Sequence, residues 1–248
     1  MSKPVENRPH LVKIQIDSRR LFQRAPKSLD VGGADLGYAV HCLLAATFGA
    51  EAPGPFAVTG IQGRRTTVLG VSGSDATTLA RDASTFADPE DHQSIDWESF
   101  ASKPLPVEWP AKTRYRFSVR AVPVRRVGKT STRVKGGAEV DAFLTACWEA
   151  GDDVAVDRET AYRAWLTEQL GRDGAATLVS CRVASFKLER MVRRTTGEKR
   201  CGRRVVRPDV TFEGVLEVAN PQSFTALLRR GLGRHRAFGY GLLLLRRE

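Results

Sequence analysis

A fixed order of hydrophobic patterns in the second half of the chain constrains the fold more than any other feature of the sequence. Alternating apolar and polar residues indicate half-buried strands, and apolar residues at helical spacing indicate amphipathic helices. In order, the patterns predict a strand in 113–124, a helix in 157–171, strands in 176–194 and 200–218, a helix in 221–230 and a strand in 240–247. Both helices begin with capping signals, Asp157 in one and Asn220 followed by Pro221 in the other.

The order strand, helix, strand, strand, helix, strand is that of the ferredoxin-like, or RRM-like, fold, which belongs to the α+β class. The first half of the chain follows part of the same plan. A strand is predicted in 11–16, a helix between Asp35 and Gly49, and two short strands in 55–71. The polar residues 72–104 give no clear pattern.

Prolines at positions 104, 106 and 110 mark a linker between the two halves. We therefore predict two tandem ferredoxin-like domains, an N-terminal domain in 1–110 and a C-terminal domain in 111–248. The halves share no close sequence repeat, so the duplication is expected in structure only. A basic β-hairpin is predicted in the second domain.

The chain is strongly basic, with 39 Lys and Arg residues against 28 Asp and Glu and a formal net charge of +11. Such a surface attracts phosphate polymers or acidic membranes. An arginine-rich composition inherited from a GC-rich genome is the alternative explanation. Clustering of the charge favours a specific partner, because between residues 190 and 207 eight basic residues stand against the single acid Glu198.

This basic segment predicts a hairpin with its tip at 195–197. Two basic strands side by side have the dimensions to enter a nucleic-acid groove, whereas charge that only prevents aggregation of a sheet edge is the alternative. The predicted nucleic-acid-binding residues of the hairpin are Arg190, Arg193, Arg194, Lys199, Arg200, Arg203, Arg204 and Arg207.

The sequence predicts neither a metal site nor a cofactor. The four cysteines, Cys42, Cys147, Cys181 and Cys201, form no C-x-x-C pair, and the four histidines form no H-E-x-x-H motif. No apolar segment resembles a secretory signal or approaches the roughly 18 residues that span a bilayer. We therefore expect a cytoplasmic protein without a membrane partner.

Tyr38 and His41 lie three residues apart on the first predicted helix, and both fall outside its apolar stripe. Neither is expected in the core. A phenol and an imidazole on one exposed helix face can transfer protons to and from a substrate near neutral pH. A solvated helix face with no catalytic role is the alternative.

The segment "GLGRHRAFGYG", residues 231–241, contains two Gly-x-Gly units. A dinucleotide-binding loop follows a strand and precedes a helix, whereas here a helix precedes and a strand follows. We predict instead that Gly231, Gly233, Gly239 and Gly241 let the backbone approach a phosphate while Arg234 and Arg236 supply charge. His235 is a second candidate proton donor, or an ordinary surface histidine.

Four segments together resemble the CasE family, the CRISPR RNA-processing endoribonucleases of type I-E systems. They are "DLGYAVHCLLAATFG", "TRYRFSVRAVPVRR", "AWLTEQLG" and "VTFEGVLEVANPQSFTALLRRGLGRHRAFGYGLLLL". The last is the most specific, and the resemblance extends over most of the chain from about Leu11. The polar stretch 72–104 and extra N-terminal residues depart from shorter members.

The resemblance implies an endoribonuclease that binds the stem-loop of CRISPR repeat RNA and cuts 3′ of the stem without a metal. Attack by a ribose 2′-hydroxyl leaves a 2′,3′-cyclic phosphate and a 5′-hydroxyl. By position, His41 would transfer a proton, most simply to the departing 5′-oxygen, and Tyr38 would orient or help deprotonate the 2′-hydroxyl. The partners would be the processed RNA and the other subunits of a Cascade complex.

Two other interpretations remain open at this stage. One is an RNA-binding subunit that holds a guide RNA without cutting it, and the other is a basic ferredoxin-like protein of translation or ribosome assembly. The sequence also leaves open whether the complex is of type I-E or belongs to a type IV system.

Overall fold

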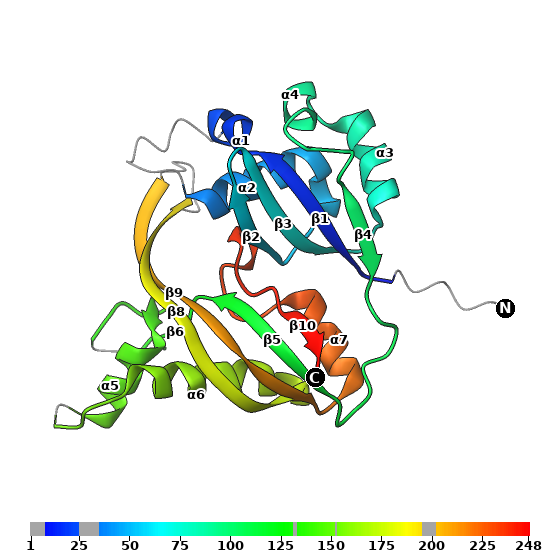
Figure 1. The fold of residues 1–248 in the computed structure, drawn as a ribbon. Coiled ribbons are helices and arrows are strands. Elements are labelled where there is room, and N and C mark those ends of the chain that lie inside the picture. The colour runs from blue at the N-terminus through cyan, green and yellow to red at the C-terminus, as the bar shows by residue number, and fades with distance from the viewer. Residues whose placement is uncertain (1–7, 25–34, 131–132, 152, 195–201) are drawn as a thin grey trace. The chain divides into compact units, whose positions relative to one another are not determined.

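The computed structural model describes residues 8–24, 35–130, 133–151, 153–194 and 202–248 (Figure 1). These residues group into two compact units. The first unit contains the described residues within 1–108, 192–205 and 235–242, and the second those within 109–191, 206–234 and 243–248. Two segments from the second half of the chain therefore belong with the first unit. The division into domains 1–110 and 111–248 stays a prediction.

The first unit is built on a four-stranded antiparallel sheet with the strand order β2-β3-β1-β4. Its elements are β1 (His10–Asp17), α1 (Ser18–Arg24), α2 (Leu36–Phe48), the 3-10 turn η1 (Gly49–Glu51), β2 (Phe56–Gln62), β3 (Arg65–Ser72), α3 (Ala76–Phe86), α4 (Pro89–His92) and β4 (Ala101–Pro104).

The predicted strand and helix at the start of this unit are confirmed. Val12, Ile14 and Ile16 alternate along β1 and are fully buried in one cluster with Val40 and Leu44 of α2. The two elements therefore bury their apolar sides against each other, which is the main stabilising contribution in a ferredoxin-like unit.

Both ends of α2 follow from its sequence. Asp35 Oδ1 accepts a hydrogen bond from the backbone N–H of Tyr38 at 3.0 Å, which satisfies a donor that the first turn leaves unpaired. At the other end Gly49 has a φ of 56°, a conformation that glycine adopts without steric cost, and its N–H donates to the carbonyl of Ala45.

The polar stretch 72–104, which gives no pattern in the sequence, contains α3, α4 and β4. Asp75 caps α3 by accepting a hydrogen bond from the N–H of Thr78 at 2.8 Å. Leu79 and Ala83 are the buried residues of α3, so its apolar stripe is too short to give a periodic signal. Strand β4 pairs with β1 and completes the strand, helix, strand, strand, helix, strand order.

The second unit is built on a sheet with the strand order β10-β5-β9-β8. Its elements are β5 (Arg114–Ala121), β6 (Val124–Arg126), β7 (Glu139–Asp141), α5 (Ala142–Ala150), α6 (Arg158–Gly171), the 3-10 turn η2 (Arg172–Gly174), β8 (Ala176–Arg194), β9 (Gly202–Val218), α7 (Pro221–Arg230) and β10 (Leu244–Arg247). The 3-10 turn η3 (Arg236–Phe238) lies between α7 and β10 in sequence. The small β6-β7 sheet and α5 were not predicted.

Helices α6 and α7 lie on one face of this second sheet (Figure 1). Trp165 of α6 and Phe224 of α7 are fully buried with Phe117 of β5 and Phe212 of β9. In both units the first and third strands of the plan are central and the second and fourth lie at the edges. The predicted α+β class with two ferredoxin-like domains is confirmed.

Gly214 allows β8 and β9 to approach each other closely. A Cβ atom at this position would lie 2.0 Å from the carbonyl oxygen of Ser180 and 2.9 Å from the Cα of Cys181. We therefore predict that Gly214→Ala lowers the free energy of unfolding by about 1–3 kcal/mol, because the strands must separate to admit the methyl group.

Chemical denaturation of Gly214→Ala measures this effect. Gly60→Ala is the matched control, because Gly60 also lies in a strand, β2, and a Cβ there would meet no atom within 4 Å. A denaturation midpoint for Gly214→Ala equal to that of Gly60→Ala would contradict the prediction.

Candidate active site

Tyr38 and His41 lie one turn apart on α2, and their ring centroids are 6.4 Å apart with the rings tilted by 53°. His41 is half-buried, but Tyr38 is only 6 % exposed. The expectation that neither residue belongs to the core is therefore wrong for Tyr38. The periodicity of α2 alone places Tyr38 away from the apolar stripe, yet it is covered by a residue from a distant part of the chain.

That residue is Phe238 of η3, within the glycine-rich segment 231–241. Its ring stacks on Tyr38 with centroids 6.0 Å apart and an interplanar angle of 19°, and meets the ring of His41 edge-on at 5.0 Å. His235 lies farther from Phe238, at 6.5 Å. Offset and edge-to-face aromatic pairs of this kind restrict ring orientation beyond what burial alone does. Phe238 therefore fixes both candidate catalytic rings from one side.

Gly37 brings the backbone of η3 against the first turn of α2. A Cβ at Gly37 would lie 2.2 Å from the carbonyl oxygen of Phe238 and 3.0 Å from its carbonyl carbon. Only a residue without a Cβ permits this approach. In the sequence G-Y-x-x-H, Gly37 leaves space for the backbone of η3. Tyr38 and His41 carry the two rings that Phe238 covers.

The four glycines of residues 231–241 all have left-handed backbone conformations. The φ angles are 74° at Gly231, 66° at Gly233, 85° at Gly239 and 79° at Gly241. His235 also has a positive φ, 61°, which is uncommon for a residue with a Cβ. The glycines are therefore required by the path of the backbone, and their predicted contact with an RNA phosphate stays a prediction.

Two of the predicted RNA-binding arginines share one carboxylate. Arg234 Nε donates to Oε1 of Glu139, and Arg207 Nε lies 3.6 Å from Oε2 of the same side chain, which is 16 % exposed. Glu139 was not among the predicted site residues, because no sequence pattern links it to Arg207 or Arg234. A phosphate that binds these guanidiniums must share them with Glu139 or replace it.

Of the remaining predicted RNA-binding residues, the structure describes the side chains of two. Arg190 is exposed on β8 and Arg236 is half-buried in η3. The other predicted residues of the hairpin lie outside the side chains that the structure describes, namely Arg193, Arg194, Lys199, Arg200, Arg203 and Arg204.

A second polar cluster, around Arg158, has the character of a structural network. The Arg158 guanidinium lies 3.9 Å from the ring centroid of Phe143, 3.1 Å from the Tyr162 hydroxyl and 3.5 Å from Asp141. Burial raises the pKa of both Asp141 and Tyr162 above their usual values.

Burial also raises the pKa of the Cys181 thiol to about 11, so that this thiol is protonated at neutral pH and is a poor nucleophile.

Among the described side chains, no three His, Cys, Asp or Glu residues lie close enough together to hold a metal ion. Within the same described ranges, no helix has the length and apolar character of a transmembrane segment.

A family profile, a curated relative and solved structures all relate this chain to CRISPR-associated proteins. The profile of a family described as "CRISPR associated protein" matches residues 10–247. A curated relative, "CRISPR-associated endoribonuclease Cse3" of Thermus thermophilus, is 34% identical over 146 residues, which are 58% of this chain and 61% of that protein. The alignment thus spans less than two thirds of the relative.

Solved structures show the same fold over nearly the whole chain. CRISPR endoribonuclease Cse3 bound to a 19-nucleotide RNA matches with a TM-score of 0.62 at 20% identity, over 96% of this chain and 99% of the other. A chain of a CRISPR RNA-guided surveillance complex matches with a TM-score of 0.58 at 15% identity, over 96% and 100%. The match of the family profile to almost every residue confirms the resemblance seen in the sequence, and the chain belongs to this family of CRISPR-associated proteins.

Proposed function

We propose that the protein is an endoribonuclease that cuts CRISPR repeat RNA at a phosphodiester on the 3′ side of its stem. The observation that carries the proposal is the His41 imidazole, half-buried on α2 beside Tyr38 and held edge-on by Phe238. An imidazole that is oriented but still partly exposed can reach a substrate and exchange a proton near neutral pH. Family membership and the endoribonuclease named Cse3 support the assignment.

The proposed reaction is an internal transesterification. The 2′-oxygen attacks the adjacent phosphorus and loses its proton, the bond from phosphorus to the 5′-oxygen breaks, and His41 donates a proton to that oxygen. The products are a 2′,3′-cyclic phosphate and a 5′-hydroxyl. Tyr38 orients the 2′-hydroxyl or helps to deprotonate it, and its low exposure leaves little of its surface for the substrate.

Other residues supply the proposed contacts with RNA. The backbone of residues 231–241, with Arg234 and Arg236, binds the phosphates next to the cut, and the basic hairpin that includes Arg190 and Arg207 binds the stem. The protein then stays on the mature RNA as a subunit of a Cascade-type complex in the cytoplasm. The likeness to a chain of a CRISPR RNA-guided surveillance complex supports this partner.

The test is cleavage of a repeat hairpin RNA by purified protein in EDTA. We expect one round of cutting and a cyclic phosphate end, identified because it resists phosphatase until mild acid opens the ring. A 2′-deoxy substitution at the nucleotide before the cut is expected to block the reaction, since it removes the nucleophile. Cutting that requires magnesium, or that proceeds on the 2′-deoxy RNA, would refute the proposed mechanism.

A non-catalytic RNA-binding subunit is the second candidate, and the burial of Tyr38 favours it, because a phenol that is 6 % exposed offers little surface to a substrate. Binding does not separate the two candidates, since a basic protein binds many RNAs in a salt-dependent manner. Cleavage does. Membership in a family of CRISPR-associated proteins argues against a role in ribosome assembly.

A further inference from the structure

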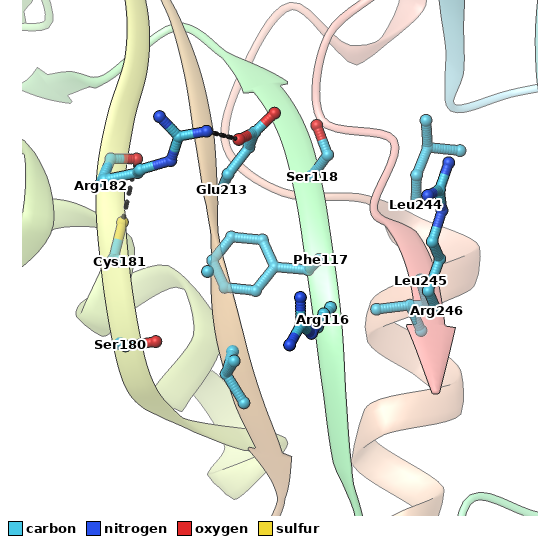
Figure 2. Close-up of a pocket in the computed structure, with 12 residues that line it drawn as sticks. Arg116, Phe117, Ser118, Ser180, Cys181, Arg182, Glu213, Leu244, Leu245 and Arg246 are labelled. Carbon is cyan, nitrogen blue, oxygen red and sulfur yellow. Dashed lines mark hydrogen bonds and ion pairs between the residues drawn. The ribbon is translucent and has the colours of Figure 1, made fainter. Parts of the chain in front are cut away.

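The open face of the sheet in the second unit carries a groove that the proposed function does not use. It has a volume of about 760 Å³ and lies over strands β10, β5, β9 and β8 (Figure 2). Helices α6 and α7 cover the opposite face, where Phe117 of β5 is buried with them. The side chains that project into the groove therefore belong to the alternate residues of each strand, among them Arg116 and Ser118.

The acidic residues on this face are already neutralised. Each carboxylate has an arginine within ion-pair distance on a neighbouring strand. The pairs are Glu213 with Arg182 at 2.5 Å, Glu217 with Arg114 at 3.1 Å, and Asp209 with Arg120 at 2.6 Å. The charge that remains on the face is therefore positive.

On strands β5 and β10 that remaining charge sits on Arg116 and Arg246. The two residues are direct cross-strand partners in the pairing of β5 with β10, and both are exposed. Directly opposed residues have Cβ atoms about 4.5–5.5 Å apart, and like charges in such a pair destabilise a sheet. Among the side chains that the structure describes, neither guanidinium has an ion-pair partner. An anion bound between them would replace this repulsion with two charge-assisted hydrogen bonds.

We propose that Arg116 and Arg246 bind a backbone phosphate of a single-stranded part of the RNA, outside the stem-loop that the active site takes. This inference rests on the proposed function for the presence of RNA. Ser118, which is adjacent to Arg116 on the same face of β5, supplies a hydroxyl donor, and the cross-strand partner of Ser118 is Leu244, which gives the groove an apolar floor.

The groove recognises the backbone and not the bases. RRM-type sheets that read single-stranded RNA stack bases on aromatic side chains of their central strands. Here the central strands present Arg116 and Val215, and the aromatic residue among the lining residues, Phe117, is 4 % exposed and belongs to the core. We therefore expect this contact to be independent of the RNA sequence and sensitive to salt.

The experiment compares a minimal repeat stem-loop with the same stem-loop carrying single-stranded extensions of increasing length at either end. The double variant Arg116→Gln/Arg246→Gln is expected to bind the extended RNA roughly tenfold more weakly than wild type, with a salt dependence shallower by about one phosphate contact. Its affinity for the minimal stem-loop, and its rate of cutting it, are expected to equal those of wild type.

Two further variants make the result specific. Arg114→Gln removes the same charge from the same face of β5, but at a position paired with Glu217, and is expected to bind extended RNA as wild type does. Arg116→Lys/Arg246→Lys is expected to restore most of the affinity, since a phosphate accepts hydrogen bonds from lysine as well. Equal losses in the Arg114 variant would show a general charge effect and would overturn the proposal.

Wild-type affinity of the glutamine double variant for every extended RNA would also overturn it. Failure of the proposed function has a separate signature. If wild-type protein cuts none of the RNAs, the assignment as an endoribonuclease is wrong, whereas the comparison of affinities still decides the role of Arg116 and Arg246.

Discussion

Replacing His41 by alanine is expected to slow the cutting of repeat RNA by about 10²–10⁴-fold and to leave RNA affinity nearly unchanged. The variant removes the group proposed to protonate the departing 5′-oxygen. His41 is half-buried and meets the ring of Phe238 edge-on at 5.0 Å, and it is not in the fully buried core, so we expect the variant to fold. Single-turnover cleavage with enzyme in excess measures the chemical step, and equilibrium binding to an uncleavable 2′-deoxy RNA measures affinity.

Two other histidines of the first unit provide the comparison. His92→Gln changes an imidazole that stacks on Trp97 and not on Tyr38 or Phe238, and is expected to cut at the wild-type rate. His235→Ala tests the rival proton donor in the glycine-rich segment and is expected to cost much less than His41→Ala. Unimpaired cutting by His41→Ala, or a larger loss in His235→Ala, would show that the proton donor does not lie on α2.

Gly37→Ala is expected to reduce the same rate by on the order of 10²-fold, although Gly37 carries no functional group. Alanine normally favours a helix over glycine by up to about 1 kcal/mol, so α2 itself should be no less stable. The added Cβ would, however, lie 2.2 Å from the Phe238 carbonyl oxygen and push η3 away from α2. A displacement of about 1 Å at catalytic groups is enough for a loss of this size.

The measurement is again single-turnover cutting, together with thermal unfolding to confirm that the variant is folded. Gly60→Ala, at an open position of β2, is the matched control and is expected to cut as wild type does. A wild-type rate for Gly37→Ala would mean that the contact between α2 and η3 does not position the reacting groups.

The fold of the second unit was largely predictable because its signals are local. Asp157 and Asn220 cap their helices by accepting hydrogen bonds from the N–H groups of Thr160 and Ser223, and alternation along β5 reports the burial of one face. The β6-β7 sheet was missed, since strands of three residues are too short to show a period. Helix α5 was missed because it buries Ala142 and Thr145 and no apolar stripe.

The candidate site was predictable only in part, because some of its residues lie far from α2 in the sequence. The spacing of Tyr38 and His41 is a property of one helix and could be recognised from that helix alone. Their cover by Phe238 and the ion pairs of Glu139 with Arg207 and Arg234 depend on tertiary contacts across long separations.

The contact between Phe238 and α2 also imposes an order of events during protein synthesis. Phe238 is translated nearly 200 residues after His41, which at about 5–20 residues per second means that about 10–40 seconds separate the two. During that interval the nascent chain carries α2 without the ring that orients Tyr38 and His41. A ribosome-bound chain that has not reached residue 238 is therefore expected to lack the proposed nuclease activity.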